Sequence, residues 1–214
     1  MLHIARLFPV VVLLAGCAGS PVSSSSSGSL PSTAALSQRA AGPRCPKYRQ
    51  GSGILNNGDF HQSADPASYL TYAKGKRLAT DWQVTVLNVD FVGTSFWNFD
   101  HLCSVDLDGE SAVGGIAHHP FRTKKGAKYA LSFLMSGNSY CGPIVKKMRV
   151  VAGNETSLFT WDVSSNHDVE HGVVAARRLN FKAVSSASTL AFTSLDTAGS
   201  GCGPVIGAVS VTKG

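Results

Sequence analysis

Two segments combine aromatic and polar side chains in the way that recognition of a sugar ring requires. One is the run from Phe96 to His101, and the other is Asn138-Ser139-Tyr140. A pyranose has an apolar C–H face and a rim of hydroxyls, so its site needs an exposed flat aromatic side chain beside a few fixed polar groups. The candidate carbohydrate-binding residues are Trp97, Asn98, Asp100, Asn138 and Tyr140. For Trp97 the alternative is packing, as a plug over one end of the domain core.

Catalytic chemistry is less well supported by the residue pattern. Asp106 and Asp108 are spaced to share one strand face about 7 Å apart, which suits a pair of glycosidase carboxylates. Asp108-Gly109 is also a natural turn, however, and nothing nearby in sequence would raise the pKa of one carboxyl group to make an acid. His167 and His171 are four residues apart but lie in an interrupted segment that favours a loop over a zinc-binding helix. We therefore expect no enzyme activity, no metal and no cofactor.

The start of the chain carries a residue suited to lipid attachment. Leu14-Ala15-Gly16-Cys17 ends a short apolar run, and Arg6 supplies a positive charge before it. This run is shorter than the roughly 18 residues that span a bilayer. The pattern resembles a bacterial lipoprotein signal, which implies cleavage before Cys17, acylation of its sulfur and export to the cell envelope, at the outer membrane or cell surface. An ordinary secretory signal is the alternative, and it also exports the chain.

Of five cysteines, four remain for disulfides in an oxidising compartment. Cys141-Gly142-Pro143 and Cys202-Gly203-Pro204 have matching contexts, each at a turn before an apolar strand, so we predict that Cys141 pairs with Cys202. Cys45 would then pair with Cys103. The sequence alone leaves the other pairings open, and the absence of close Cys/His spacing disfavours a zinc site.

Composition divides the chain into three parts. Residues 1–16 form the predicted signal peptide, residues 17–42 a lipidated cysteine with a flexible Ser-rich linker, and residues 43–214 a single folded domain. The formal net charge is +6, spread over separate pairs of basic residues rather than interleaved with aromatics. This pattern disfavours nucleic-acid binding, while attraction to anionic surface polymers stays open. We expect a monomer.

The folded domain shows strand periodicity and no clean helical face. Apolar residues alternate with smaller or polar ones in many short runs, which are separated by Gly, Asn, Asp and Pro clusters. This pattern predicts an all-β sandwich of about eight strands, a jelly roll in which two sheets bury each other's apolar faces. Trp82 and Trp161 fall on the buried positions of their strands. The predicted strands centre on residues 82–86, 105–107, 116–121, 129–135, 159–163, 179–183, 190–192 and 209–211.

Several short motifs occur in an order that resembles a known family. They include Asn57-Gly58-Asp59-Phe60, Trp82-Gln83-Val84, Ser104-Val105-Asp106-Leu107, Gly137-Asn138 and Cys202-Gly203-Pro204-Val205. Together they resemble the choice-of-anchor C domain, a bacterial family similar to the plant cell-wall proteins of domain-of-unknown-function family 642. The resemblance covers nearly all of residues 54–212. It implies a galactose-binding-like β-sandwich that holds polysaccharide, and Trp97 fits a position where the family tends to carry Trp.

Two departures from the family pattern concern oxygen donors. The family commonly has Glu where this chain has His61, and Asp-Asn where it has Gly207-Ala208. Sandwiches of this kind often place a structural calcium between their first and last strands, and calcium needs several carboxylate and carbonyl oxygens. The loss of both sets argues against that site here.

The sequence thus favours a lipid-anchored, exported, non-catalytic module that binds polysaccharide or a cell-envelope glycan. One alternative is a structural or protein-interaction module of the envelope. A second alternative is a glycan-active hydrolase on the same fold.

Overall fold

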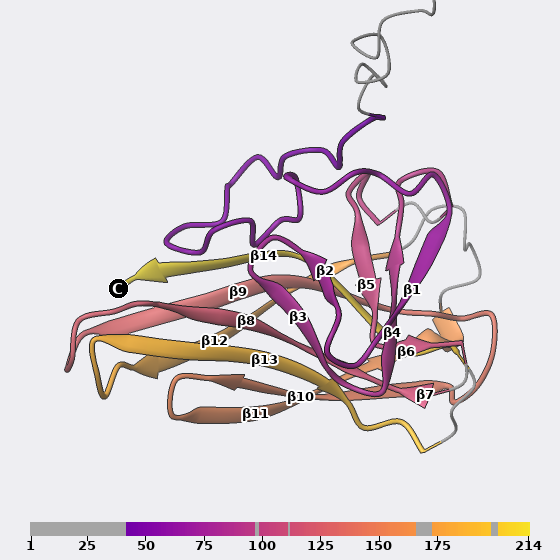
Figure 1. Ribbon diagram of the computed structural model, residues 1–214. Helices are drawn as coiled ribbons and strands as arrows, with labels where there is room; N and C mark the ends of the chain where they lie inside the picture. The colour runs from indigo at the N-terminus through magenta and orange to yellow at the C-terminus, as the bar shows by residue number, and fades with distance from the viewer. Residues whose placement is uncertain (1–41, 97–98, 111, 166–172, 198–200) are drawn as a thin grey trace, which may run out of the picture. The chain divides into compact units, whose positions relative to one another are not determined.

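The computed structural model describes residues 42–96, 99–110, 112–165, 173–197 and 201–214 (Figure 1). The predicted signal peptide, Cys17 and the predicted linker up to residue 41 lie outside the described residues, as do Trp97, Asn98, His167 and His171. The described part contains no α-helix, only a 3-10 turn over Val163–Ser165. It also contains no helix with the length and apolar character that crossing a bilayer requires.

The domain is a sandwich of two antiparallel sheets, which confirms the predicted all-β class. The first sheet has six strands. Their order is β1 (Tyr69–Ala73), β4 (Asn88–Val92), β5 (Ser104–Asp106), β14 (Pro204–Lys213), β9 (Lys128–Gly137) and β12 (Ala175–Lys182). The second sheet also has six strands. Their order is β11 (Glu155–Asp162), β10 (Val145–Ala152), β13 (Ala187–Ser194), β8 (Gly115–Arg122), β3 (Trp82–Val86) and β2 (Arg77–Ala79). A small ribbon pairs β6 (Asp108–Gly109) with β7 (Ala112–Val113).

The chain changes sheet repeatedly, so distant segments become neighbours. From β8 onward it passes from one sheet to the other at almost every connection, and β14 lies between β5 and β9 (Figure 1). This connectivity is that of the predicted jelly roll. The sheets hold more strands than the eight expected because β1, β2, β4 and β10 are short or charged strands with a weaker alternating pattern.

The core lies between the sheets and follows from the alternation of side chains along each strand. Trp82 is fully buried and its ring lies 5.5 Å from that of Phe60. Phe133 packs edge-on against Phe192 across the interface between the sheets, at 5.2 Å. Trp161 is buried as predicted, with the Arg177 guanidinium 5.3 Å from its ring centre. Each such large apolar side chain contributes about 1.5–3 kcal/mol through burial.

Pro120 occupies a position where the sheet does not need its missing N–H. It lies inside β8, a central strand, where proline would ordinarily remove a ladder hydrogen bond. The pairing of β8 with β13 shifts register between Ser188 and Leu190, opposite Pro120, and the pairing with β3 ends at His118. The strand predicted over residues 116–121 is therefore continuous through the proline.

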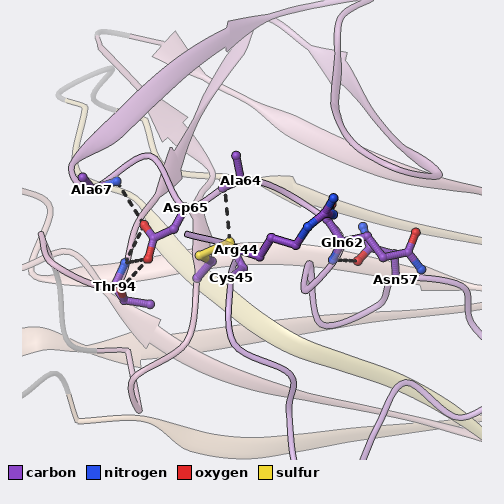
Figure 2. The surroundings of a disulfide bond; sticks show 9 residues. Arg44, Cys45, Asn57, Gln62, Ala64, Asp65, Ala67 and Thr94 are labelled. Atoms are coloured by element: carbon purple, nitrogen blue, oxygen red, sulfur yellow. Dashed lines mark hydrogen bonds between the residues drawn. A yellow bond between two sulfur atoms is a disulfide. The ribbon is translucent and has the colours of Figure 1, made fainter. Parts of the chain in front are cut away.

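Both predicted disulfides are confirmed. Cys141 is bonded to Cys202, and Cys45 to Cys103. The second bond ties the start of the described domain to the segment just before β5. Figure 2 shows the surroundings of Cys45, where Arg44 pairs with Ala64 in an isolated bridge.

Candidate functional site

A row of three polar residues and one valine crosses the first sheet on its outer face. Asp90 on β4 lies opposite Asp106 on β5, and Asp106 lies opposite Val205 on β14, which lies opposite Ser136 on β9. Residues opposite one another in neighbouring strands point to the same face. Phe91, next to Asp90, belongs to the core cluster between the sheets. Since successive side chains alternate, the row points away from that core.

A cleft of about 230 Å³ lies over the acidic end of this row. Three aromatic side chains line it, each contributed by a different part of the chain: Tyr69 at the start of β1, Phe96 after β4 and Tyr140 after β9. Their exposed fractions are 45, 43 and 60 %. The rings of Tyr69 and Phe96 lie 5.2 Å apart. Such exposed aromatics offer flat apolar surfaces beside polar groups.

Asp65 positions two of these aromatics from behind. Its carboxylate accepts hydrogen bonds from the Ala67 N–H, two residues before Tyr69, and from the Thr94 N–H and hydroxyl, two residues before Phe96 (Figure 2). One side chain therefore fixes both turns. Gly93 is required at this junction because a Cβ there would lie 2.3 Å from an Asp65 carboxylate oxygen.

Asn138 links the floor of the cleft to the third aromatic. Its side-chain Nδ2 donates to Asp106 at 2.8 Å, and its Oδ1 accepts from the Tyr140 backbone N–H at 3.1 Å. Its own N–H donates to the Gly203 carbonyl at 2.9 Å. The Asn138 side chain is 8 % exposed. This residue therefore holds the Tyr140 turn against the sheet.

The two aspartates of the row are both buried at the base of the cleft, with 8 % of Asp90 and 2 % of Asp106 exposed. Burial raises the pKa of Asp106 to about 8, although hydrogen bonds from Asp108 N, Asn138 and Gly203 N oppose the rise. Burial also raises the pKa of Asp90, against hydrogen bonds from the Thr71 hydroxyl and the Glu110 backbone. Both side chains are thus acceptors whose charged forms are disfavoured by their surroundings.

A buried lysine supports the walls of the cleft. Lys146 on β10 is fully buried, and its Nζ donates to the carbonyl oxygens of Cys141 and Cys202, the two bonded cysteines. Burial lowers the pKa of Lys146, and Asp196, Asp106 and Asp108 oppose that shift. The lysine joins the loop after β9 to the segment before β14, and both border the cleft.

Asp108 does not form a carboxylate pair in the cleft with Asp106. The strand is interrupted at Leu107, Asp108 begins β6, and its side chain is fully buried without lining the cleft. Burial raises the pKa of Asp108 to about 6. The carboxylic acid next to Asp106 in the sheet is Asp90, on the neighbouring strand β4. The spacing of residues in the sequence does not indicate that these two strands pair.

The predicted site residues are partly brought together. Asn138 and Tyr140 both line the cleft. Asp100 does not; it lines a separate hollow of about 430 Å³ next to Tyr48. Trp97 and Asn98 lie outside the described residues, between Phe96 of the cleft and Phe99, which is fully buried over the outer face of the first sheet.

Sequence reasoning did not select Tyr69, Asp90, Phe96 or Glu110, which also line the cleft. Phe96 carried a usable signal because it begins the aromatic run that was singled out. Tyr69 and Asp90 become neighbours only through the pairing of β1 with β4. Nothing in the sequence indicates that Glu110, just after β6, approaches them.

His61, the first departure from the family pattern, is hydrogen-bonded to Asp59. Its Nδ1 lies 2.6 Å from a carboxylate oxygen of Asp59, whose side chain is 1 % exposed. Burial alone would raise the pKa of Asp59, but the His61 and Tyr48 N–H hydrogen bonds hold it below its usual range. Within the described ranges, no group of three or more His, Cys, Asp or Glu residues is placed to hold a metal ion.

Comparison with protein-family models gives one match, over residues 53–212, to the family described as "Protein of unknown function (DUF642)". The chain belongs to the DUF642 family. The match spans the sandwich from the segment before Phe60 through β14, so this DUF642 domain contains every residue of the cleft. No curated protein matches the chain.

Solved structures similar to this DUF642 protein include several carbohydrate-binding modules. A family 35 module from Clostridium thermocellum is 16 % identical, with a TM-score of 0.41, and the match covers 67 % of this chain and 97 % of the module. TmCBM61 in complex with β-1,4-galactotriose is 9 % identical, with a TM-score of 0.39 and coverage of 77 and 100 %. The C-terminal CBM6 of a laminarinase from Zobellia galactanivorans is 11 % identical, with a TM-score of 0.37 and coverage of 68 and 100 %.

Proposed function

We propose that the domain binds carbohydrate in the cleft on the outer face of its first sheet, without chemical conversion of the ligand. The observation that carries the proposal is the joint placement of three exposed aromatics, Tyr69, Phe96 and Tyr140, around the polar groups of Asp90 and Asn138. The aromatic rings suit the C–H face of a sugar, and the acceptors suit its hydroxyls.

The rigidity of the cleft supports the same proposal. Asp65 fixes the turns before Tyr69 and Phe96, while Asn138 and Lys146 fix the loop that carries Tyr140. A site held in place before the ligand arrives loses less conformational entropy on binding. Exposed aromatics on such supports are more suited to recognition than to packing.

A catalytic role is less well supported by the contacts of Asp106. Both of its oxygens accept hydrogen bonds from within the protein, from Asp108 N, Gly203 N and Asn138 Nδ2. A group engaged in this way is a structural acceptor rather than an acid poised to protonate a glycosidic oxygen. Sugar release in a digestion assay with the same glycans, lost on Asp106→Asn, would instead favour the hydrolase alternative.

We also propose that the chain is exported and tethered to the bacterial cell envelope, at the outer membrane or cell surface, through a lipid on Cys17. The support is the lipobox-like Leu14-Ala15-Gly16-Cys17 and the two disulfides, which persist in oxidising compartments. Envelope glycans and surrounding polysaccharides are the ligands that such a location offers. We propose further that the domain is of the choice-of-anchor C type.

The binding proposal is tested by affinity electrophoresis of the full chain, expressed with export, in native gels cast with pectin, xylan, cellulose or peptidoglycan fragments. At least one polymer is expected to retard the protein. Tyr140→Ala should weaken that binding about tenfold, the equivalent of about 1.4 kcal/mol. Trp97→Ala tests the predicted binding residue that follows Phe96, a residue of the cleft, in the sequence.

Leu158→Ala is the matched control, because Leu158 is 69 % exposed and lies on β11 in the other sheet. Equal retardation of Tyr140→Ala and the wild type would remove the cleft as the binding site. Absence of retardation together with capture of one specific envelope protein would favour the interaction-module alternative.

A further inference from the structure

Among the described residues, the Asp, Glu, Lys and Arg side chains that line the cleft are all carboxylic acids. They are Asp90, Asp106 and Glu110, with no lysine or arginine beside them. The chain as a whole has a formal net charge of +6. The charged groups of the cleft are therefore opposite in sign to the net charge of the whole chain.

The acidic groups occupy two levels. Asp90 lies at the base, where the Thr71 hydroxyl donates to it at 2.6 Å. Asp106 lies beside it on the neighbouring strand, and each of its two carboxyl oxygens already accepts a hydrogen bond from an N–H group. Glu110 is exposed and reaches the cleft from the turn after β6. A ligand seated against Tyr69 and its neighbours would therefore meet Glu110 near the surface and Asp90 below.

Lys146 interacts by charge with one of these acidic groups but does not line the cleft. Lys146 interacts with Asp106 electrostatically, but its side chain is fully buried and its ammonium donates to the carbonyls of Cys141 and Cys202. It is therefore behind the wall of the cleft. A carboxylate on a sugar would find no basic side chain among the described lining residues to pair with.

We propose that Glu110 and Asp90 make the cleft select its glycan by charge: it takes neutral or amino sugars and excludes uronic acids. This inference rests on the proposed carbohydrate binding. A uronate carboxylate would be repelled by Glu110 and would lose its hydration beside Asp90 without compensation. Neutral hydroxyls can donate to the same acceptors, and an ammonium group gains both the carboxylates and the faces of the aromatic rings.

The experiment measures binding of the full-length protein to an array of hexasaccharides with neutral, amino and uronic sugars. It includes three that share one β-1,4-linked glucan backbone: cellohexaose, the glucosamine hexamer and the glucuronate hexamer. The best neutral or amino ligand should bind at least tenfold more tightly than the uronate of the same backbone in low salt. The ratio should fall as NaCl is raised, because salt screens charges near the surface.

The double variant Asp90→Asn/Glu110→Gln should lower that ratio at least fivefold, whatever it does to absolute affinity. Glu155→Gln is the matched control, because Glu155 begins β11 and lines a different hollow, beside Lys128 and Lys182. The ratio of affinities for the neutral or amino ligand and for the uronate should be the same in Glu155→Gln as in the wild type.

Two failures can be told apart. If none of the oligosaccharides binds, the proposed function fails and the charge selection fails with it. If glycans bind but uronates bind as tightly as their neutral counterparts, or the ratio is the same in the double variant, binding stands and selection by charge is overturned.

Discussion

At the scale of single residues, Lys146 links the two loops that carry the bonded cysteines Cys141 and Cys202. It is fully buried, and its ammonium donates to two backbone carbonyls among three aspartates that interact with it. Removing one partner from a buried charge cluster leaves the others uncompensated. Lys146→Met is therefore expected to lower the free energy of unfolding by about 3–5 kcal/mol, measured by urea denaturation.

Lys147→Met provides the control because Lys147 is exposed and alternates with Lys146 on the same strand. Its effect should lie within about 0.5 kcal/mol of zero. Equal effects of the two variants on the free energy of unfolding would show that the buried Lys146 ammonium does not stabilise the fold more than an exposed lysine does.

The raised pKa of Asp106 gives the domain an unusual pH dependence. In the unfolded chain an aspartate ionises near pH 3.9, whereas burial raises the pKa of Asp106 to about 8 in the folded domain. Between these values the folded state holds a proton that the unfolded state has released. The free energy of unfolding should therefore fall as pH rises from about 4 to 8, by on the order of a few kcal/mol.

Asp108, whose pKa burial raises to about 6, adds to this decline in the lower part of the window. Asp59 acts in the opposite sense, because its lowered pKa makes its contribution disappear in acid below pH 4. Asp106→Asn should flatten the decline above pH 6 in thermal unfolding followed by circular dichroism. A wild-type Tm that is constant or rises from pH 5 to 8 would contradict the expectation.

At the scale of elements, the disulfides close loops of similar length in different parts of the sandwich. The bonded cysteines are separated by 58 residues in Cys45–Cys103 and by 61 in Cys141–Cys202. By loop entropy in the unfolded chain, each bond contributes about 4 kcal/mol. The paired substitutions Cys45→Ala/Cys103→Ala and Cys141→Ala/Cys202→Ala are therefore expected to cost comparable free energy of unfolding.

The two paired substitutions should differ in their effect on glycan binding. Only Cys202 of these cysteines lines the cleft, and its bond to Cys141 holds the loop next to Tyr140. Loss of that bond should weaken retardation in affinity gels more than loss of the other bond at equal folded fraction. A reversed order would place the binding surface elsewhere.

The sequence predicted the two-sheet fold more completely than the set of residues that line the cleft. Alternation placed Trp82 and Phe133 in the core, and matching Cys-Gly-Pro contexts indicated the Cys141–Cys202 bond, because these signals are local. Asn138 and Tyr140, predicted together because one short segment contains both, also line one cleft. Asp90 joins Asp106 only through strand pairing, and a register cannot be read from one strand alone.

Proximity in sequence does not by itself place a residue in the cleft. Asp100 was grouped with Trp97 because they are neighbours in sequence, yet Asp100 has a positive φ of 51° and lines a different hollow from the cleft. A backbone in the left-handed region turns the chain sharply. Adjacent residues at such a turn need not share a surface.

At the scale of the whole molecule, the proposed glycan binding and the proposed membrane attachment belong to different parts of the chain. The cleft lies within residues 53–212, the part matched by the family model, whereas the proposed anchor is Cys17. Several acyl chains on one cysteine give a stable attachment, unlike the marginal binding of a single chain. Cys17→Ser should therefore move the protein from the membrane fraction to the soluble exported fraction without changing the affinity of the cleft for its glycan.

Metabolic labelling with a radioactive fatty acid supplies the direct measurement. The wild type should incorporate label that cosediments with membranes, while Cys17→Ser should incorporate none. Ala18→Ser, which changes the next residue and keeps the cysteine, is the control and should be labelled like the wild type. An unlabelled wild type that is found in the soluble exported fraction would replace the lipoprotein signal with an ordinary secretory one, and the proposed glycan binding would then occur without a tether.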